Sequence, residues 1–259
     1  NGDFDRAVEM IHAAKLAGAD YVKFQTAVPE LVISSIAPKA EYQKETTGEG
    51  ESQLDMCRKI HLRLEDYAPL KKLCDEAGIG FLSTPFDLVS IDCLDALGMD
   101  YWKIPSGEIT NLPYLRKIGE KGERVILSTG MSELHEIDAA LRVLEQAGTP
   151  RSNVMLLHCN TQYPTPMEDV NLRSMEALST LGAGSIGYSD HTVGIEVPVA
   201  AVALGAVLNR APVCIAGTSV QNQESLLRFS KSNVAVSAAY RDKGVLIVRA
   251  YEILGKETQ

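Results

Sequence analysis

The sequence lacks any apolar run close to the eighteen or so residues that a membrane span needs. It also lacks a signal peptide, because it opens with the polar residues Asn1-Gly2-Asp3 and passes directly into a predicted helix. An initiator methionine is missing as well, so we expect further residues upstream. These absences predict a cytoplasmic protein that has no membrane partner.

A basic stripe is also missing. The formal net charge of −9 comes from scattered acidic residues, which argues against nucleic acid as a partner. An anionic ligand would therefore have to be held by a local cluster of donors, against the overall field of the protein.

Several motifs of common enzyme classes are absent. The five cysteines show no CxxC spacing, which is typical of reduced thiols in a cytoplasmic protein. No GxGxxG follows the first predicted strand, so a dinucleotide-binding fold lacks its signature. No GxSxG motif or Ser-His-Asp order occurs, which argues against acyl-transfer hydrolysis.

What the sequence does contain is a regular alternation of strands and helices, with a period near 25 to 30 residues. Such alternation predicts a parallel sheet, and polar residues at the strand exits favour a TIM-type (β/α)₈ barrel over an open doubly wound sheet. About six clear strands occur before residue 190, where a complete barrel of this kind would have seven, so the first strand is expected before Asn1. The predicted strands cover 21–25, 80–84, 99–104, 124–128, 154–159 and a segment from 186, and the predicted helices cover 4–17, 64–77, 86–97, 113–119, 133–147, 172–181 and 195–204.

The segment from about 26 to 61 is long and polar, without clear periodicity. We interpret it as a functional excursion, because connections of more than twelve structureless residues are uncommon in compact domains.

The most informative stretch is Gly187-Tyr188-Ser189-Asp190-His191-Thr192, which would bring a hydroxyl, a carboxylate and an imidazole to the end of a buried strand. In an α/β barrel the active site lies at the carboxyl ends of the strands. A purely structural alternative is that His191 caps the following helix and Ser189 closes a turn.

Polar residues also lie where the other predicted strands end, and we call these positions strand exits. Lys23 and Gln25 share one strand face, because side chains alternate along a strand; an edge strand with its polar face in water is the alternative. Two lysines, several hydroxyls and glycine amides suit a phosphate and a carboxylate together, and a histidine beside an aspartate suits a divalent cation or acid–base chemistry. The residues alone thus indicate a barrel enzyme that acts on a small phosphorylated anion. The exits are Lys23 and Gln25, Ser83 and Thr84, Lys103 and Ser106, Ser128 and Thr129, Asn160 to Tyr163, and Ser189 to His191.

Over about residues 1–206 the sequence resembles the sialic acid synthase family, the N-acetylneuraminate synthases and their legionaminic and pseudaminic relatives. The resemblance is carried, in order, by residues 1–3, VKFQ (22–25), PKAEYQK (38–44), FLSTPFD (81–87), WKIPSGE (102–108), LSTGM (127–131), HCNTQYPTP (158–166), DVNL (169–172) and GYSDHTVG (187–194).

The resemblance implies a barrel that condenses phosphoenolpyruvate with open-chain N-acetylmannosamine, or a related 2-acetamido sugar, and releases phosphate. It places Lys23, Lys103, Ser106 and Ser189 on phosphoenolpyruvate, with Thr84, Asn160 and Thr161 nearby, and it places Gln25 and Tyr163 on the sugar. Lys23, Asp190 and His191 are the expected catalytic residues.

The same resemblance implies a divalent metal, Mn²⁺ or Mg²⁺, with His191 as one of two histidine ligands and a homodimeric assembly. The metal would polarise the sugar aldehyde as a Lewis acid, and C3 of the enol would attack it. Lysines and amides aimed at the phosphate would stabilise its departure.

The resemblance ends near residue 211. The family's eighth strand carries the second metal-binding histidine, and the equivalent stretch here, 207–211, has Ala211 at that position. We therefore divide the chain into a barrel domain, 1–211, and a divergent tail, 212–259, that lacks a convincing antifreeze-like domain; within the tail, 245–248 is expected as a strand and 251–254 as a helical turn.

Three functional hypotheses remain at this point. The chain is an active synthase whose metal shell is completed by Asp190 or a tail residue, or it is a catalytically degenerate scaffold or phosphoenolpyruvate-binding module. A different barrel that uses phosphoenolpyruvate, such as an octulosonate or heptulosonate synthase, is the third, and residues 39–43 argue against it. Changing Ala211 to histidine is expected to raise Mn²⁺ affinity if the strand-eight alignment is correct.

Overall fold

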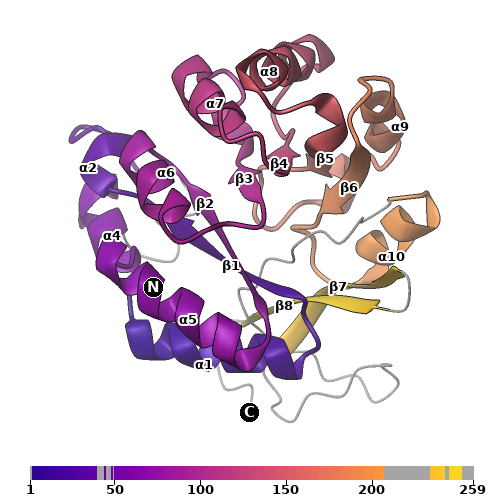
Figure 1. Ribbon diagram of the computed structural model, residues 1–259. Helices are drawn as coiled ribbons and strands as arrows, with labels where there is room; N and C mark the ends of the chain where they lie inside the picture. Colours follow the sequence, from indigo (N-terminus) through magenta and orange to yellow (C-terminus); the bar gives the residue numbers. More distant parts are fainter. Residues whose placement is uncertain are drawn as a thin grey trace.

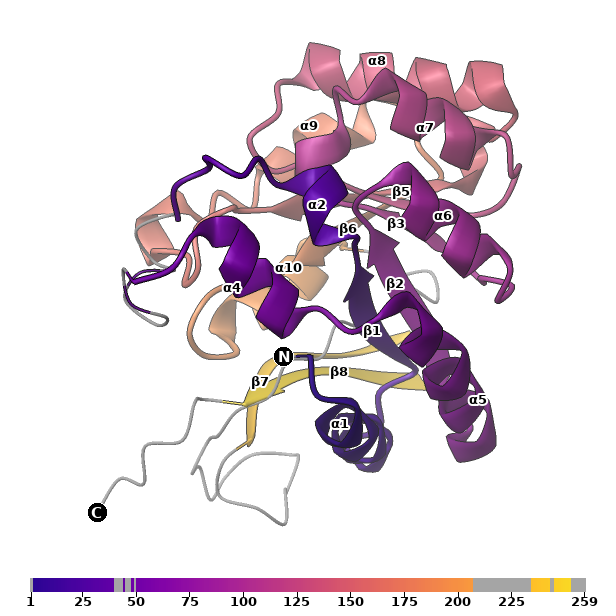
Figure 2. The same ribbon diagram turned by 90° about the vertical axis from the view of Figure 1, so that its left-hand side faces the viewer.

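The computed structural model describes residues 2–39, 44, 48, 50–206, 234–242 and 245–252, the last two ranges for their backbone. Six parallel strands follow one another in chain order, and the helices between them cover the outer side of a curved array (Figure 1). The view turned by 90° shows the same arrangement, with α5, α6 and α7 outside β1, β2 and β3 (Figure 2). The predicted α/β fold with parallel strands is therefore confirmed.

The strands form two hydrogen-bonded parallel groups. One group pairs β1 with β2, and the other has the order β3-β4-β5-β6. All six strands that the alternation predicted are present, with ends that differ by at most three residues. They are β1 (Tyr21–Thr26), β2 (Gly80–Pro85), β3 (Trp102–Ile104), β4 (Val125–Ser128), β5 (Val154–Cys159) and β6 (Ser185–Ser189).

The helices also follow the predicted order. Those between the strands are α1 (Phe4–Leu16), α5 (Tyr67–Ala77), α6 (Leu88–Asp95), α7 (Leu112–Gly119), α8 (Leu134–Ala147), α9 (Ser174–Ser179) and α10 (Glu196–Ala203). Short 3₁₀ turns lie at Leu64–Asp66, Ser106–Glu108, Arg151–Asn153 and Met167–Asp169.

Local signals explain several of the helix ends. The Asp3 carboxylate accepts a hydrogen bond from the backbone amide of Arg6 at 3.0 Å and so caps the start of α1. Gly78 ends α5 in the left-handed region, with φ of 67°, where glycine carries no side-chain penalty. These ends return the chain to the sheet at the residues that the sequence predicted.

The described part of the predicted excursion, residues 26–61, includes two helices that its polar composition concealed. They are α2 (Pro29–Val32) and α4 (Gln53–Ile60), and α4 buries Leu54, Met56 and Cys57. At the base of this segment the Lys39 ammonium donates to the Gly48 carbonyl at 3.0 Å and contacts Glu51 at 3.2 Å. The absence of periodicity over the whole segment was therefore a misleading signal, because an eight-residue helix is too short to dominate it.

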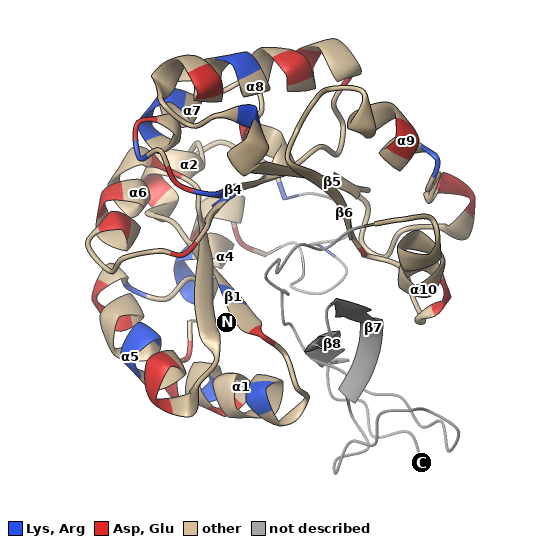
Figure 3. Ribbon diagram, turned by 45° about the vertical axis from the view of Figure 1, so that its right-hand side comes forward, with Lys and Arg blue, Asp and Glu red and all other residues tan. Residues whose placement is uncertain are grey.

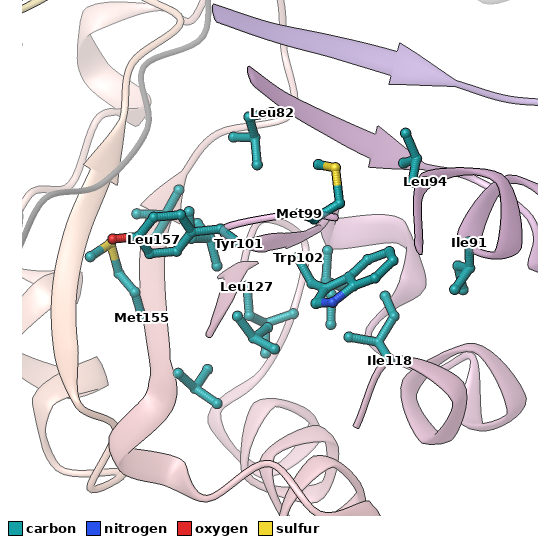
Figure 4. Packing of buried hydrophobic residues seen from close by; sticks show 14 of the residues in the cluster. Leu82, Ile91, Leu94, Met99, Tyr101, Trp102, Ile118, Leu127, Met155 and Leu157 are labelled. Atoms are coloured by element: carbon teal, nitrogen blue, oxygen red, sulfur yellow. The ribbon is translucent and has the colours of Figure 1, made fainter. Parts of the chain in front are cut away.

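The core has two kinds of strand surface. Because parallel partners in register face the same side, Lys23, Leu82 and Thr84 lie on one face, and Val22, Phe24 and Phe81 lie on the other. Figure 4 shows the same alternation further along, where Tyr101 lies with Met155 and Leu157, and Trp102 lies toward Ile118 of α7. The outer face packs against helices, and the inner face carries the polar strand exits.

In the tail, β7 (Val234–Asp242) and β8 (Val245–Glu252) form an antiparallel pair, and β7 lies against α10 (Figure 1). The strand predicted at 245–248 is confirmed. The helical turn predicted from 251 is wrong, because Tyr251 pairs with Ala235 in the β7–β8 ladder. The expected eighth strand, 207–211 with Ala211, lies outside the described residues.

In the view of Figure 3, Lys and Arg residues are interspersed with Asp and Glu residues over the outer helices of the described part of the chain. Over the same residues, none of the helices has both the length and the apolar character that crossing a membrane requires.

Candidate active site

Most of the polar residues predicted from the strand exits lie on the inner face of the array, at the carboxyl ends of its strands. Lys103 on β3 is nearly buried, with 8% of its surface exposed. Its ammonium donates hydrogen bonds to the Ser128 hydroxyl at 2.7 Å and to the Ile104 carbonyl at 2.8 Å. A buried ammonium held in this way presents fixed positive charge next to the neighbouring strand ends.

A second cluster joins the ends of β3, β4 and β5. The Ser106 hydroxyl accepts a hydrogen bond from the Gly130 amide at 2.9 Å and lies 3.4 Å from the Cys159 sulfur. Any side chain at residue 130 would meet the Thr161 methyl at 2.9 Å and the Ser106 oxygen at 3.1 Å. Glycine is therefore required there by the close approach of three strand exits.

The first two strands contribute Lys23, Gln25 and Thr84. Gln25 is paired in register with Thr84, and Lys23 is paired with Leu82, so their side chains share the inner face. Gln25 is exposed, Lys23 is partly exposed and Thr84 is buried. The Thr84 hydroxyl has no hydrogen-bond partner among the described residues, which is costly for a buried polar group unless a ligand supplies one.

Ser83, in contrast, does not belong to this site. Its hydroxyl lies 2.7 Å from the Thr26 hydroxyl on the outer face, where both are fully buried. Tyr67 of α5 donates to the Gln25 carbonyl at 2.6 Å from the same side. Strand alternation separates Ser83 from Thr84, so only one of this pair of hydroxyls points to the inner face.

The sequence did not predict that Tyr67 would hold the strand that carries Gln25. Burial raises its pKa to about 12 from an ordinary value of 10.0, so its hydroxyl remains a neutral donor at physiological pH. A tyrosine one residue past a 3₁₀ turn carries no sequence signal for this role, since only the tertiary structure brings it under β1.

The loop after β5 carries the next predicted residues. The Asn160 side chain accepts the backbone amide of Gln162 at 2.8 Å, which turns the chain sharply after the strand. Thr161 lies against Gly130 within this turn. The Tyr163 ring is about half exposed and lies 4.2 Å from the His191 ring, centroid to centroid.

His191 is oriented by the neighbouring loop. Its Nδ1 lies 2.7 Å from the Asn160 carbonyl oxygen, and because a carbonyl only accepts, Nδ1 carries a proton. The structural alternative, in which His191 caps the next helix, is wrong. Helix α10 has Ile195 at its N-terminal boundary and no side-chain cap.

Ser189 ends β6 and Asp190 follows it directly. Asp190 is buried, and its Oδ1 accepts from the Thr192 amide at 2.9 Å and from the Thr192 hydroxyl at 2.7 Å. Ser189 is paired in register with Cys159, so it lies next to the Ser106 cluster. Asp190 thus holds the turn that presents His191, and Ser189 faces the inner side.

His191 is a residue of this site that could bind a metal ion. The orientation of His191 suits a ligand, because metal-binding histidines commonly donate their other ring nitrogen to a backbone carbonyl. However, no group of three His, Cys, Asp or Glu side chains able to hold a metal occurs among the residues that the structure describes. Within those residues His191 is a candidate ligand, without the further side chains that would complete a metal shell.

Comparison with known proteins gives a consistent result. A family model, NeuB family, matches residues 10–209. The N,N′-diacetyllegionaminic acid synthase of Campylobacter jejuni is 50% identical over 206 residues, which cover 80% of this chain and 62% of that protein. The N-acetylneuraminate-9-phosphate synthase of Homo sapiens is 34% identical over 211 residues, which cover 81% of this chain and 58% of that protein. The chain therefore spans about three fifths of the length of these relatives.

Solved structures agree. The N-acetylneuraminic acid synthetase of Leptospira borgpetersenii, crystallised with citrate, has a TM-score of 0.67 at 32% identity and covers 79% of this chain and 66% of that one. A truncated 3-deoxy-D-arabino-heptulosonate 7-phosphate synthase of Thermotoga maritima has a TM-score of 0.54 over 79% of this chain and 68% of that one. At 14% identity the second likeness concerns the fold alone.

The relatives are sialic, legionaminic and pseudaminic acid synthases, as the resemblance of residues 1–206 predicted. The alternative of an octulosonate or heptulosonate synthase is therefore not supported at the level of family. With 200 of its 259 residues matched, the chain belongs to the NeuB family.

Proposed function

We propose that the protein condenses phosphoenolpyruvate with a 2-acetamido sugar to give a nonulosonic acid and inorganic phosphate. The observation that carries this proposal is the cluster of donors at the carboxyl ends of β3 and β4. There the Lys103 ammonium is held by Ser128, and Ser106 is held by Gly130. A buried lysine, hydroxyl groups and nearby backbone amides match the oxygens of a small dianion.

The reaction needs little covalent chemistry from the protein. C3 of phosphoenolpyruvate forms a bond to the aldehyde carbon of the open-chain sugar, whose oxygen takes up a proton. Water adds to C2, and the resulting tetrahedral carbon expels phosphate as the ketone forms. We assign Lys23, Lys103, Ser106 and Ser189 to phosphoenolpyruvate, where fixed donors stabilise the departing phosphate without reorganising.

Thr84 is assigned to the same substrate. Its buried hydroxyl has no partner among the described residues, so an incoming carboxylate or phosphate oxygen would satisfy it. Asn160 and Thr161 lie at the neighbouring turn and are assigned to the same region. Gln25 and Tyr163 are the more exposed residues of the site, and we assign them to the sugar.

The choice of sugar substrate is guided by the similarity to two N,N′-diacetyllegionaminic acid synthases, from Campylobacter jejuni and Legionella pneumophila. Their name indicates a product with two N-acetyl groups. Phosphoenolpyruvate contains no nitrogen, so both groups would come from the sugar. A diacetamido sugar is thus our first candidate substrate, and N-acetylmannosamine is the second.

A divalent cation, Mn²⁺ or Mg²⁺, belongs to this proposal, with His191 Nε2 as one ligand. Such an ion would act as a Lewis acid toward the sugar aldehyde. In this chain Asp190 would hold the loop that presents His191, and the Asn160 carbonyl would fix the tautomer of its ring. Further ligands would come from outside the described residues or from water.

We also propose that the strands belong to a (β/α)₈ barrel, and that the protein acts as a cytoplasmic homodimer. The second candidate function is a phosphoenolpyruvate-binding scaffold without catalysis. The observation that favours it is that no group of three His, Cys, Asp or Glu side chains able to hold a metal occurs among the described residues.

Phosphate release distinguishes the two. The purified chain is given phosphoenolpyruvate and Mn²⁺ with the diacetamido sugar, with N-acetylmannosamine or with no sugar, and each mixture is repeated with EDTA. Release that depends on both sugar and metal supports the synthase. No release from a folded sample that binds phosphoenolpyruvate supports the scaffold, and a folded sample that does not bind phosphoenolpyruvate contradicts both.

A further inference from the structure

Cys159, the last residue of β5, contacts a proposed substrate-binding hydroxyl. Its sulfur lies 3.4 Å from the Ser106 oxygen, which also accepts the Gly130 amide at 2.9 Å. Cys159 is buried, with 7% of its surface exposed. A buried thiol is therefore in hydrogen-bonding contact with the Ser106 hydroxyl.

The direction of the sulfur–oxygen hydrogen bond follows from how many hydrogen bonds the Ser106 hydroxyl can donate and accept. A serine hydroxyl has one hydrogen to donate and two lone pairs to accept with. One lone pair is already used by the Gly130 amide. If the hydroxyl hydrogen is given to an anionic ligand, which forms the stronger bond, the contact to Cys159 can exist only with the thiol as donor.

We propose that Cys159 is a positioning residue, whose S–H group fills the second lone pair of Ser106 and so directs the Ser106 hydrogen toward the bound anion. The inference rests on the proposed function, because it takes phosphoenolpyruvate as that anion. Cys159 touches Ser106 and acts through it, so its contribution appears in substrate binding.

The packing around Gly130 supports this role. A side chain added at Gly130 would lie within 3.2 Å of the Cys159 carbonyl, the Ser106 oxygen and the Thr161 methyl. The three strand exits are thus in close contact, and the Gly130 amide and the Cys159 thiol are both placed to direct the Ser106 hydroxyl. Removing the thiol takes away one of the two groups that direct it.

The first test measures the dissociation constant of phosphoenolpyruvate by calorimetry for the wild type, Cys159→Ala, Cys159→Ser and a control. Cys57→Ala is the matched control, because Cys57 is also 7% exposed but lies on α4 rather than beside Ser106. Losing one weak hydrogen bond predicts that Cys159→Ala raises the dissociation constant by about two- to tenfold. Serine restores a donor and is expected to stay within about twofold of the wild type.

Infrared spectroscopy gives a signature that a purely structural role would not. The difference between wild type and Cys159→Ala isolates the S–H stretching band of Cys159. Phosphoenolpyruvate is expected to move this band to lower wavenumber, because the thiol then donates, and Ser106→Ala is expected to abolish the shift.

The outcomes distinguish a failure of the proposed function from a failure of the role proposed for Cys159. If folded wild type does not bind phosphoenolpyruvate, the proposed function fails and the inference fails with it. If it binds, but Cys159→Ala has the same affinity as Cys57→Ala and the band does not move, the inference alone is overturned. Loss of affinity in both alanine variants would assign the effect to general destabilisation and would also overturn it.

Discussion

Replacing Lys103 by alanine should weaken phosphoenolpyruvate binding by about 10- to 140-fold. The ammonium is nearly buried and held by Ser128 and Ile104, so it does not need to be ordered or fully desolvated when the ligand arrives. A hydrogen bond that involves a charged group contributes about 1.5–3 kcal/mol, and each 1.4 kcal/mol is a factor of ten in affinity.

The effect on folding has to be separated from the effect on binding. Alanine removes a buried charge, and it also leaves the Ser128 hydroxyl without its donor. Lys103→Met is therefore a second variant, because it keeps most of the side-chain volume and removes only the charge and the donors. Both variants should lose affinity to a similar extent.

Calorimetric titration with phosphoenolpyruvate, together with the thermal unfolding midpoint of each variant, is the appropriate assay. Lys117→Ala is the control, since Lys117 also bonds a carbonyl, that of Leu88, and an acidic partner, but on the outer helices. An unchanged dissociation constant in folded Lys103→Ala and Lys103→Met would remove Lys103 from the site and would refute the reasoning.

Three further predictions address other parts of the molecule. Gly130→Ala should lower kcat/KM roughly tenfold or more, because its Cβ displaces Ser106 and Thr161, whereas Gly107→Ala, which meets nothing within 4 Å, should behave like wild type in the same steady-state assay. His191→Ala should weaken Mn²⁺ binding by at least about 10- to 100-fold in a metal titration, because losing only a hydrogen-bond partner of a metal ligand already costs that much. The same affinity as in His135→Ala, a change at an exposed helix residue, would contradict the assignment. Burial raises the pKa of the Cys74 thiol from 9.0 to about 12, so its contribution to stability is complete below pH 9 and is lost as the pH rises toward 12. Urea unfolding should show the stability difference between wild type and Cys74→Ala shrinking over that range by up to about 1.4 kcal/mol per pH unit, and a constant difference would show that the thiol titrates equally in both states.

The order of elements could be predicted from the sequence because each element carries its own local signal. Gly78 ends one helix and Pro85 ends one strand, and the apolar runs between such residues have the periods of helices and strands. The helix α4 was missed because its own local signal is weak. Eight residues within a polar segment do not give a clear helical period.

The faces of the strands were only partly predictable. The sequence grouped Ser83 with Thr84 as one polar exit, but adjacent residues on a strand point to opposite sides. The register of β1 with β2 decides which one faces inward, and it assigns Ser83 to Thr26 and Thr84 to the site.

By itself, the sequence determined the α/β order, the strand exits that carry polar groups and the membership of the family, because motifs and periods are local. Only the tertiary structure decided which of these groups meet. The Lys103–Ser128 bond, the Ser106–Gly130–Cys159 contacts and the tautomer of His191 each join residues 24 to 53 positions apart in the chain. No local pattern specifies such pairs, since they arise when parallel strands align in register and bring their carboxyl ends to one edge.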